Sequence, residues 1–408
     1  MLMSFENSVK KGYYRCFQFC MGLAAHFVDW SKPQRITGEG SLDKLPALIK
    51  DNGLKKILFV TGPHLVKTLG PRMSEMLAAN GLSLAVFSDV EANPSVETVN
   101  AIYEKYLAEK CEGFVALGGG SPIDAAKAAA ARVAAGGRTL DKMAGLLKVG
   151  RKLPLFIAVP TTSGTGSETT FAAVITDRAN NHKYAIMDPH LIPRFAVMDP
   201  RLAAGMSPKT TSTTGMDALT HAVEAYLCWT NTTRESIRLA EEATCTIFRY
   251  LERAYRDGED MEAREQMMTA AFKAGFAFTR SGVGNVHAIA HTLGGFYNTP
   301  HGLANAVILP IVLEDYGAAV YDKLARLAEL TGVAADGTAE EKARAFIREV
   351  YDMNRRMGIP TGFSFIRDED IPTMVKYALR EANPVYPVPV VYTAEHCAEV
   401  IRRIRAMA

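Results

Sequence analysis

Residues 114–127 read FVALGGGSPIDAAK, and this stretch decides the fold of the first half of the chain. The four apolar residues are typical of a buried strand, and the glycines at 118–120 allow a sharp turn. Ser121 and Pro122 suit the first positions of a helix, whose free N–H groups bind phosphate. The stretch therefore predicts a strand, a glycine turn and a helix that together hold a pyrophosphate. A tight turn that binds nothing is the alternative.

Two familiar nucleotide motifs are missing from the sequence. It contains no GxxxxGK[ST] loop, and no GxGxxG follows the first expected strand. A second polar loop, PTTSGTGSE at 160–168, follows another expected strand. Open α/β sheets bind ligands at the carboxyl ends of their strands, and small hydroxyl side chains suit ribose and pyrophosphate. We therefore expect a relative of the dinucleotide-binding folds rather than the standard form.

Short apolar strands alternate with helical segments up to about residue 205, which favours a parallel sheet covered by helices on both faces. The expected strands are Ile57–Thr61, Leu82–Ser88, Phe114–Leu117, Leu155–Val159 and Phe195–Met198. Helices are expected at Leu65–Asn80 and Val96–Ala108, and a hairpin is expected to join Val174–Thr176 to Tyr184–Met187 through an Asn-rich turn.

The pattern changes after Pro208, where strand-like runs nearly vanish and long helical periodicities follow. Helices are expected at 211–227, 233–256, 260–280, 304–331, 338–357, 370–381 and 394–406. We therefore expect three segments. An amphipathic helical extension occupies 1–30, an α/β dinucleotide-binding domain occupies 31–205, and an all-α domain for metal and substrate occupies 206–408.

The first 30 residues contain an amphipathic pattern. Between 5 and 28, apolar residues recur every three or four positions and form one helical stripe. Arg15 and Gln18 interrupt the apolar stretch, so a signal peptide is not expected. Three interpretations remain open: the helix docks on its own chain or a partner subunit, it directs the enzyme to an assembly, or it lies on a membrane surface.

Composition excludes several classes of protein. Hydrophobic residues make up 48% and charged residues 22%, and 46 Lys and Arg nearly balance 44 Asp and Glu, so nothing points to nucleic acid. No apolar run reaches the roughly 18 residues of a membrane span, so no transmembrane segment is expected. The six cysteines form no CxxC pair or dense framework, which predicts reduced thiols and a cytoplasmic protein.

Histidines gather in the second half at metal-ligand spacing. Asp217 and His221 are four residues apart and share a helix face, and His287 and His291 repeat that spacing. His301 follows in a loop. A carboxylate with several imidazoles suits a borderline divalent ion such as iron or zinc. A set of ordinary core histidines is the alternative.

These motifs resemble those of the iron-dependent (group III) alcohol dehydrogenases, from about Pro33 to the C-terminus. Gly118–Lys127 is similar to the family signature GGGSxxDxAK, and Gly215–His221 together with Gly282–His301 is similar to its metal signatures. The resemblance implies a dehydroquinate-synthase-like fold, with a Rossmann-related first domain, a helical second domain and an active site between them. It also implies Fe²⁺, or Zn²⁺ in its place, and a homodimer.

The resemblance further implies roles for individual residues. The implied metal ligands are Asp217, His221, His287 and His301. His291 is implied to line the substrate pocket, and we expect it to relay a proton. The implied cofactor contacts are Gly119, Gly120, Ser121, Asp124, Thr161, Thr162, Thr165 and Lys183. The implied pocket residues are Ala172, Phe278, Val283 and Leu379, whose apolar character favours a small uncharged alcohol or aldehyde.

One position departs from the family pattern. NAD-preferring members carry an Asp just after the first strand, where this chain has Gly62. An Asp there repels the 2′-phosphate of NADP, whereas Gly leaves room for it, so we expect NADP(H) to be accepted beside NAD(H). The expected activity is hydride transfer between NAD(P)(H) and the alcohol, with the metal as Lewis acid. A glycerol-type polyol dehydrogenase, a maleylacetate reductase and a dehydroquinate-synthase-type lyase are the alternatives.

Overall fold

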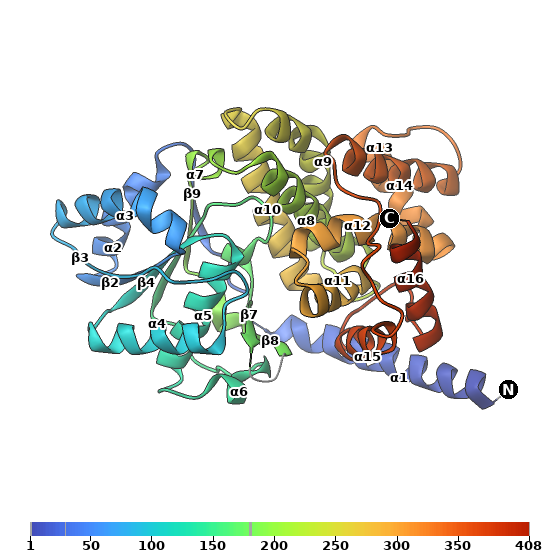
Figure 1. Ribbon diagram of the computed structural model, residues 1–408, viewed down its shortest axis with the longest axis horizontal. Coiled ribbons are helices and arrows are strands. Elements are labelled where there is room, and N and C mark those ends of the chain that lie inside the picture. Colours follow the sequence, from blue (N-terminus) through green and yellow to red (C-terminus); the bar gives the residue numbers. More distant parts are fainter. Residues whose placement is uncertain (1, 29, 179–181, 408) are drawn as a thin grey trace. The chain divides into compact units, whose positions relative to one another are not determined.

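The computed structural model describes residues 2–28, 30–178 and 182–407 (Figure 1). The chain forms two compact units. One is an α/β unit of residues 29–205, and the other is a helical unit that joins residues 1–28 to residues 206–408. An α/β first half followed by a helical second half is the fold class that the sequence predicts.

A six-stranded sheet forms the centre of the α/β unit, in the order β1-β9-β6-β4-β2-β3. Every neighbouring pair is parallel. The strands are β1 (Gln34–Thr37), β2 (Lys56–Val60), β3 (Ser83–Phe87), β4 (Gly113–Gly118), β6 (Leu155–Pro160) and β9 (Phe195–Met198). Because all run in one direction, the loops after β2, β4 and β6 leave the sheet at the same edge.

Helices cover both faces of this sheet (Figure 1). On β2, Leu58 and Val60 pack with α4 (Val96–Ala108) and α5 (Gly120–Ala134). The alternate residues of β2 pack with α2 (Leu45–Asp51) and α3 (Pro63–Ala78) on the other face. Burial on both faces explains why the central strands are continuous apolar runs.

Smaller elements complete the unit. β7 (Ala172–Asp177) and β8 (His182–Met187) pair antiparallel as the expected hairpin, and β5 (Gly145–Leu146) adds a third strand. The remaining elements are η2 (Ser41–Lys44), α6 (Leu140–Met143), η3 (Ser167–Thr169), η4 (Pro189–Leu191) and α7 (Arg201–Ala204).

The helical unit packs its helices around one apolar core. They are α8 (Pro208–Leu227), α9 (Arg234–Arg256), α10 (Met261–Ser281), α11 (Asn285–Tyr297), α12 (His301–Tyr316), α13 (Tyr321–Thr331), α14 (Ala339–Arg356), α15 (Ile371–Ala382) and α16 (Ala394–Ala406). In the described part of the chain, only His301–Ala319 is long and apolar enough to cross a membrane. This segment is mostly buried within the unit, as expected of a core helix.

Several elements differ from the sequence-based expectation: α2 and α11 lie outside the expected helix ranges, and two further differences have a clear physical reason. The single helix expected over 304–331 is two helices, because Gly317 has a φ of 51° and ends α12, and the short η5 (Gly317–Ala319) leads into α13. The strand β1 was not expected, since its four residues QRIT are mostly exposed at the edge of the sheet and have no apolar run.

The N-terminal helix α1 (Leu2–Ala24), extended by η1 (Ala25–Phe27), docks on the helical unit of its own chain. Arg15 donates hydrogen bonds to the carbonyls of Val388 (2.6 Å) and Pro389 (2.7 Å). Gln18 donates to the Tyr386 carbonyl (2.7 Å) and accepts from the indole N–H of Trp229 (2.6 Å). Tyr14, Phe17 and Met21 are partly buried beside them, so the docked face is mixed, and the two residues that interrupt the apolar stretch supply these hydrogen bonds.

Candidate active site

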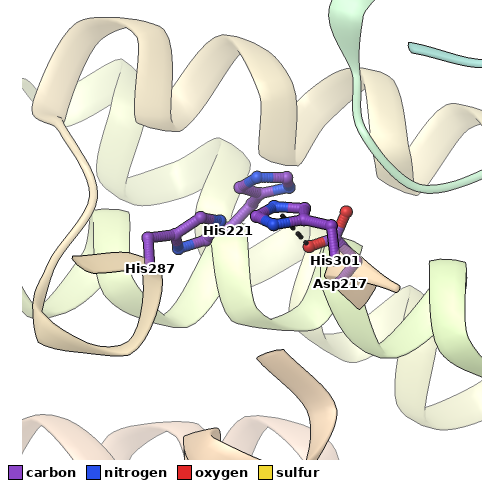
Figure 2. A group of neighbouring side chains, drawn as sticks. All are labelled: Asp217, His221, His287 and His301. Atoms are coloured by element: carbon purple, nitrogen blue, oxygen red, sulfur yellow. Dashed lines mark ion pairs between the residues drawn. The ribbon is translucent and has the colours of Figure 1, made fainter. Parts of the chain in front are cut away.

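Four potential metal ligands converge in the helical unit from three helices (Figure 2). Asp217 and His221 lie one turn apart on α8, His287 lies on α11, and His301 begins α12. One ligand atom from each residue lies within 4.8 Å of all the others. The first three side chains are buried and His301 is partly exposed, so the group is reached from one side.

A close helix contact brings His301 to Asp217. A Cβ atom on Gly302 would lie only 2.5 Å from the Thr213 carbonyl oxygen, so only glycine lets the start of α12 approach α8 this closely. His301 Nε2 then lies 3.6 Å from Asp217 Oδ1. The glycine after this histidine is thus part of how the ligands are assembled.

Glu224 holds the His287 ring in place through the Nδ1 atom. Its carboxylate oxygens lie 2.5 Å from His287 Nδ1 and accept the Val286 N–H at 2.8 Å. Burial raises the pKa of Glu224 to about 8. Burial, with the neighbouring histidines, lowers the pKa of His287 well below its usual value. The imidazole is therefore neutral near pH 7, the form that binds a metal, and its Nε2 is directed to the cluster.

Asn305 contacts three of the four candidate ligands. Its side chain is completely buried, and its amide Nδ2 donates to Asp217 Oδ1 at 2.6 Å. The same nitrogen lies 3.2 Å and 3.1 Å from Nε2 of His287 and His301. Asn305 is one turn beyond His301 on α12, so one helix supplies both a candidate ligand and a residue that orients the others.

The donor set fits a divalent ion. One carboxylate and three imidazoles, with at least one imidazole kept neutral and oriented by a buried carboxylate, match the preferences of Fe²⁺ and Zn²⁺. Four protein ligands with one partly exposed side leave room for a substrate oxygen.

The glycine turn and the second polar loop lie against each other in the α/β unit. Cβ atoms on Gly119 and Gly120 would lie 3.3 Å and 3.0 Å from the side chains of Thr162 and Thr165. The α5 helix begins at Gly120, so its free N–H groups open beside these threonines. Backbone donors and two hydroxyls thus meet at one point, as a pyrophosphate site requires.

Further cofactor candidates surround this point. Ser121 Oγ accepts the Asn93 N–H at 3.3 Å, and Asn93 Oδ1 accepts from Lys183 at 2.9 Å. Burial lowers the pKa of Lys183. Thr161 is buried and donates its N–H to the Gly118 carbonyl at 3.0 Å, while Gly62 caps the start of α3.

The Asp124 carboxylate contacts other residues of the α/β unit. One carboxylate oxygen accepts from Ser167 Oγ at 2.5 Å and the other accepts the Val174 N–H at 3.0 Å. Both contacts join α5 to the segment that follows β6. In this arrangement Asp124 supports the candidate pyrophosphate site of Gly119, Gly120, Thr162 and Thr165, called the cradle below. Direct contact of Asp124 with a cofactor stays a prediction.

Comparison with known proteins agrees with this geometry. The family model for iron-containing alcohol dehydrogenase matches residues 33–200, and the model for the C-terminal part of the Fe-containing alcohol dehydrogenase family matches residues 211–405. The chain belongs to the iron-containing alcohol dehydrogenase family. The glycine turn falls within the first match and the histidine cluster falls within the second.

Several individual proteins are similar to this family member. The NAD-dependent methanol dehydrogenase of Bacillus methanolicus is 36% identical over 376 residues, covering 91% of this chain and 97% of the relative. The NADPH-dependent butanol dehydrogenase of Clostridium saccharobutylicum is 37% identical over 328 residues, covering 79% and 82%. A crystal structure of 1,3-propanediol oxidoreductase superposes with a TM-score of 0.88 at 32% identity, covering 92% of this chain and 99% of that one.

His291 stands beside the cluster of this alcohol dehydrogenase and outside the group of four. Its ring stacks on His301 with centroids 5.1 Å apart, and its Nδ1 lies 2.6 Å from Glu381 Oε1. Tyr386 donates to the same carboxylate oxygen at 2.7 Å. These hydrogen bonds hold the His291 ring through its Nδ1 atom. A role of His291 as a proton carrier remains a prediction.

The four expected pocket residues come from both units. Phe278 stacks on His221 with ring centroids 4.3 Å apart, so it borders the metal cluster. Val283 lines a small cavity beside Glu224, and Leu379 packs on the helical core from α15. Ala172 belongs to the α/β unit, where its carbonyl accepts from Lys127 at 3.2 Å.

Sequence reasoning missed Glu224, Asn305, Glu381 and Lys127 as contributors to the site. Two of them carried a local signal: Asn305 follows His301 by one turn, and Lys127 ends the glycine-turn signature. Glu224 and Glu381 carried none, because each contacts a histidine that is 63 or 90 residues away in the chain.

Proposed function

We propose that this protein is a metal-dependent alcohol dehydrogenase and aldehyde reductase that moves a hydride between NAD(P)(H) and a small uncharged alcohol or aldehyde. The convergence of Asp217, His221, His287 and His301 on one point carries the proposal. Family membership of both halves of the chain supports it. The two groups of residues, cradle and cluster, serve one reaction.

The residues of the cluster have distinct tasks. When bound there, Fe²⁺ or Zn²⁺ acts as a Lewis acid on the substrate oxygen. Glu224 keeps His287 oriented, and Asn305 holds the Asp217 carboxylate. Phe278 presents an aromatic face beside His221, which suits an apolar substrate chain. His291, held by Glu381, carries the proton of the alcohol hydroxyl.

The cradle accepts both nicotinamide cofactors in this proposal. The backbone at Gly119 and Gly120, with the hydroxyls of Thr162 and Thr165, contacts the pyrophosphate. Gly62 leaves space for a 2′-phosphate, so NADP(H) is accepted. Relatives of both kinds are known, one described as NAD-dependent and one as NADPH-dependent.

We also propose that the protein is cytoplasmic and forms a homodimer or a larger assembly of identical chains. All six cysteines are free thiols, including the exposed Cys16 and Cys20, which suits a reducing compartment.

The test is turnover by the full chain after anaerobic reloading with Fe²⁺. Oxidation of NADPH and of NADH is followed with propanal as substrate. We expect turnover that a chelator abolishes and that Fe²⁺ restores. Protein that retains iron yet oxidises neither cofactor with propanal, butanal or lactaldehyde would contradict the proposal.

A His291→Asn variant separates the proton carrier from the ligands. We expect slower turnover with the iron content of the wild type, because the side chain lies outside the group of four. Loss of iron in this variant would instead identify His291 as a ligand. His221→Asn is the matched comparison and is expected to lose iron.

A further inference from the structure

The side of α1 that faces away from the helical unit is apolar and exposed. Exposed residues of α1, together with Phe27 of the following η1, form a stripe of Val9, Tyr13, Cys16, Cys20, Leu23 and Phe27. They are spaced by four, three, four, three and four positions, the heptad spacing of helices that pack along a straight seam. Phe27 is 91% exposed and Tyr13 is 59% exposed, so the described residues of the helical unit do not cover the stripe.

The stripe is symmetric about Gln18. Reading it from either end gives the same spacing, so a second α1 laid antiparallel matches it position by position. Val9 then lies opposite Phe27, and Tyr13 lies opposite Leu23. Cys16 lies opposite Cys20, and in each of the two outer pairs an aromatic side chain meets a smaller aliphatic one. A twofold axis requires this kind of self-complementarity, in which residue i contacts j and j contacts i.

The area is sufficient for a specific contact. At about 200 Å² for a whole aromatic side chain, the exposed parts of Tyr13 and Phe27 amount to about 300 Å² per copy. Val9 and Leu23 are both more than half exposed and add to this. Two copies therefore bury on the order of 1,000 Å², the size that distinguishes a specific interface from an incidental contact.

Hydrogen bonds hold α1 to the helical unit on the side away from the stripe. Arg15 and Gln18 fasten the opposite face to carbonyls of residues 386–389, so the stripe is presented on a helix that is held to the unit. We propose that α1 is a self-association element, in which the stripes of two copies of this chain pack antiparallel about Gln18. Pairing of the two α1 helices then joins two enzyme molecules.

Cysteine cross-linking tests the register directly. Diamide takes up the two electrons and two protons released when Cys16 of one chain and Cys20 of another form a disulfide. We expect a covalent dimer from the wild type and much less from Cys16→Ser or Cys20→Ser alone. An equal mixture of the two variants should regain the dimer, because each supplies the partner that the other lacks.

A parallel pairing gives the opposite pattern, since each single variant then cross-links through its identical cysteines. That result, or no cross-link in any sample, would overturn the proposal. The other four cysteines are buried or partly buried and serve as an internal reference for nonspecific oxidation.

A charged stripe supplies the second test. In the full chain, Tyr13→Glu with Leu23→Glu is expected to lower the mass measured by light scattering at least twofold. Lys11→Glu, on the same helix but off the stripe, should leave it unchanged. Aldehyde turnover and helix content should be the same in all three proteins. An unchanged mass in the double variant, with helix content retained, would overturn self-association through α1.

Discussion

Two buried residues, Glu224 and Asn305, hold candidate ligands of the histidine cluster in position. Glu224 fixes the tautomer and direction of His287, and Asn305 holds Asp217 from a neighbouring helix. Both side chains are buried, and each bonds to groups that belong to the candidate metal site. Such supporting contacts usually change metal affinity or activity by 10-fold to 100-fold when they are removed.

Glu224→Gln tests this support. The amide keeps the size of the side chain but cannot accept hydrogen bonds at both former carboxyl oxygens, which contact His287 Nδ1 and the Val286 N–H, so we expect iron affinity to fall by about 10-fold to 100-fold. Iron retained against a graded chelator series measures it. Glu340→Gln is the control, because Glu340 pairs only with Arg344 on the surface of α14. Equal retention by both variants would contradict the role given to Glu224.

Gly62→Asp tests cofactor choice. The new carboxylate is expected to lower kcat/KM for NADPH at least tenfold, through repulsion of the 2′-phosphate, and to leave NADH little changed. A Cβ at this position lies 3.3 Å from the Val90 carbonyl, so a small shift is needed. Gly62→Asn has the same size without the charge and should affect NADPH much less. Parallel losses in both variants would show that crowding, and not charge, is responsible.

At the scale of elements, α5 and the segment after β6 are joined by a buried cation. Lys127 Nζ donates to the carbonyls of Ser167, Thr170 and Ala172 and to the Thr170 hydroxyl, at 2.5–3.2 Å. The side chain is completely buried, and burial lowers its pKa to about 8. The final Lys of the signature therefore shapes the loop that carries the candidate cofactor contacts.

Lys127→Met is expected to destabilise the α/β unit by about 3 kcal/mol, because several buried carbonyls lose their donor. Urea unfolding followed by Trp30 fluorescence measures this, since Trp30 packs edge-on against Phe171 in the same unit. A Trp229→Phe background removes the other tryptophan. Lys142→Met, an exposed lysine of the same unit, should change stability little. A similarly small change in Lys127→Met would refute the role of the buried cation.

Elements that depend on local sequence agree with the sequence-based expectation better than those that depend on tertiary context. The central strands and most helices of the second half have strong apolar periodicities, and they form where expected. The division at Gly317 and the strand β1 were missed. The first depends on one backbone angle, and the second depends on pairing with β9, whose residues are 161 positions away in the register Gln34 to Phe195.

At the scale of the whole molecule, each compact unit holds a different half of the chemistry. All four candidate ligands lie in the helical unit, and the glycine turn and its two threonines lie in the α/β unit. A ligand stabilises only the structure that it binds, by about 4 kcal/mol when present at 1,000 times its Kd. The two units should therefore respond separately to metal and to cofactor.

Tryptophan placement allows this to be measured, because the chain has only Trp30 and Trp229, one in each unit. In a Trp30→Phe variant we expect anaerobic Fe²⁺ to raise the thermal transition reported by Trp229. In a Trp229→Phe variant we expect NADPH to raise the transition reported by Trp30. A rise of the Trp30 transition with Fe²⁺ alone, equal to that of Trp229, would contradict separate responses.

The sequence by itself determined the chemistry and the class of fold. The glycine turn, the two pairs of ligand-type residues at helical spacing and the change from alternating strands to helices are all local patterns. Each can be recognised because a strand or helix repeats every few residues. The resemblance to a family selected among the histidines, which spacing alone left open.

Only the tertiary structure decided which side chains support the site and how α1 is used. Glu224, Glu381 and the carbonyls that bind Arg15 meet their partners across 63 to 374 residues of chain, and no local pattern predicts such contacts. The amphipathic stripe predicted a helix with an apolar binding face. The structure shows that the face carrying Arg15 and Gln18 docks, because buried backbone carbonyls need donors, and that the stripe with Tyr13 and Leu23 stays exposed.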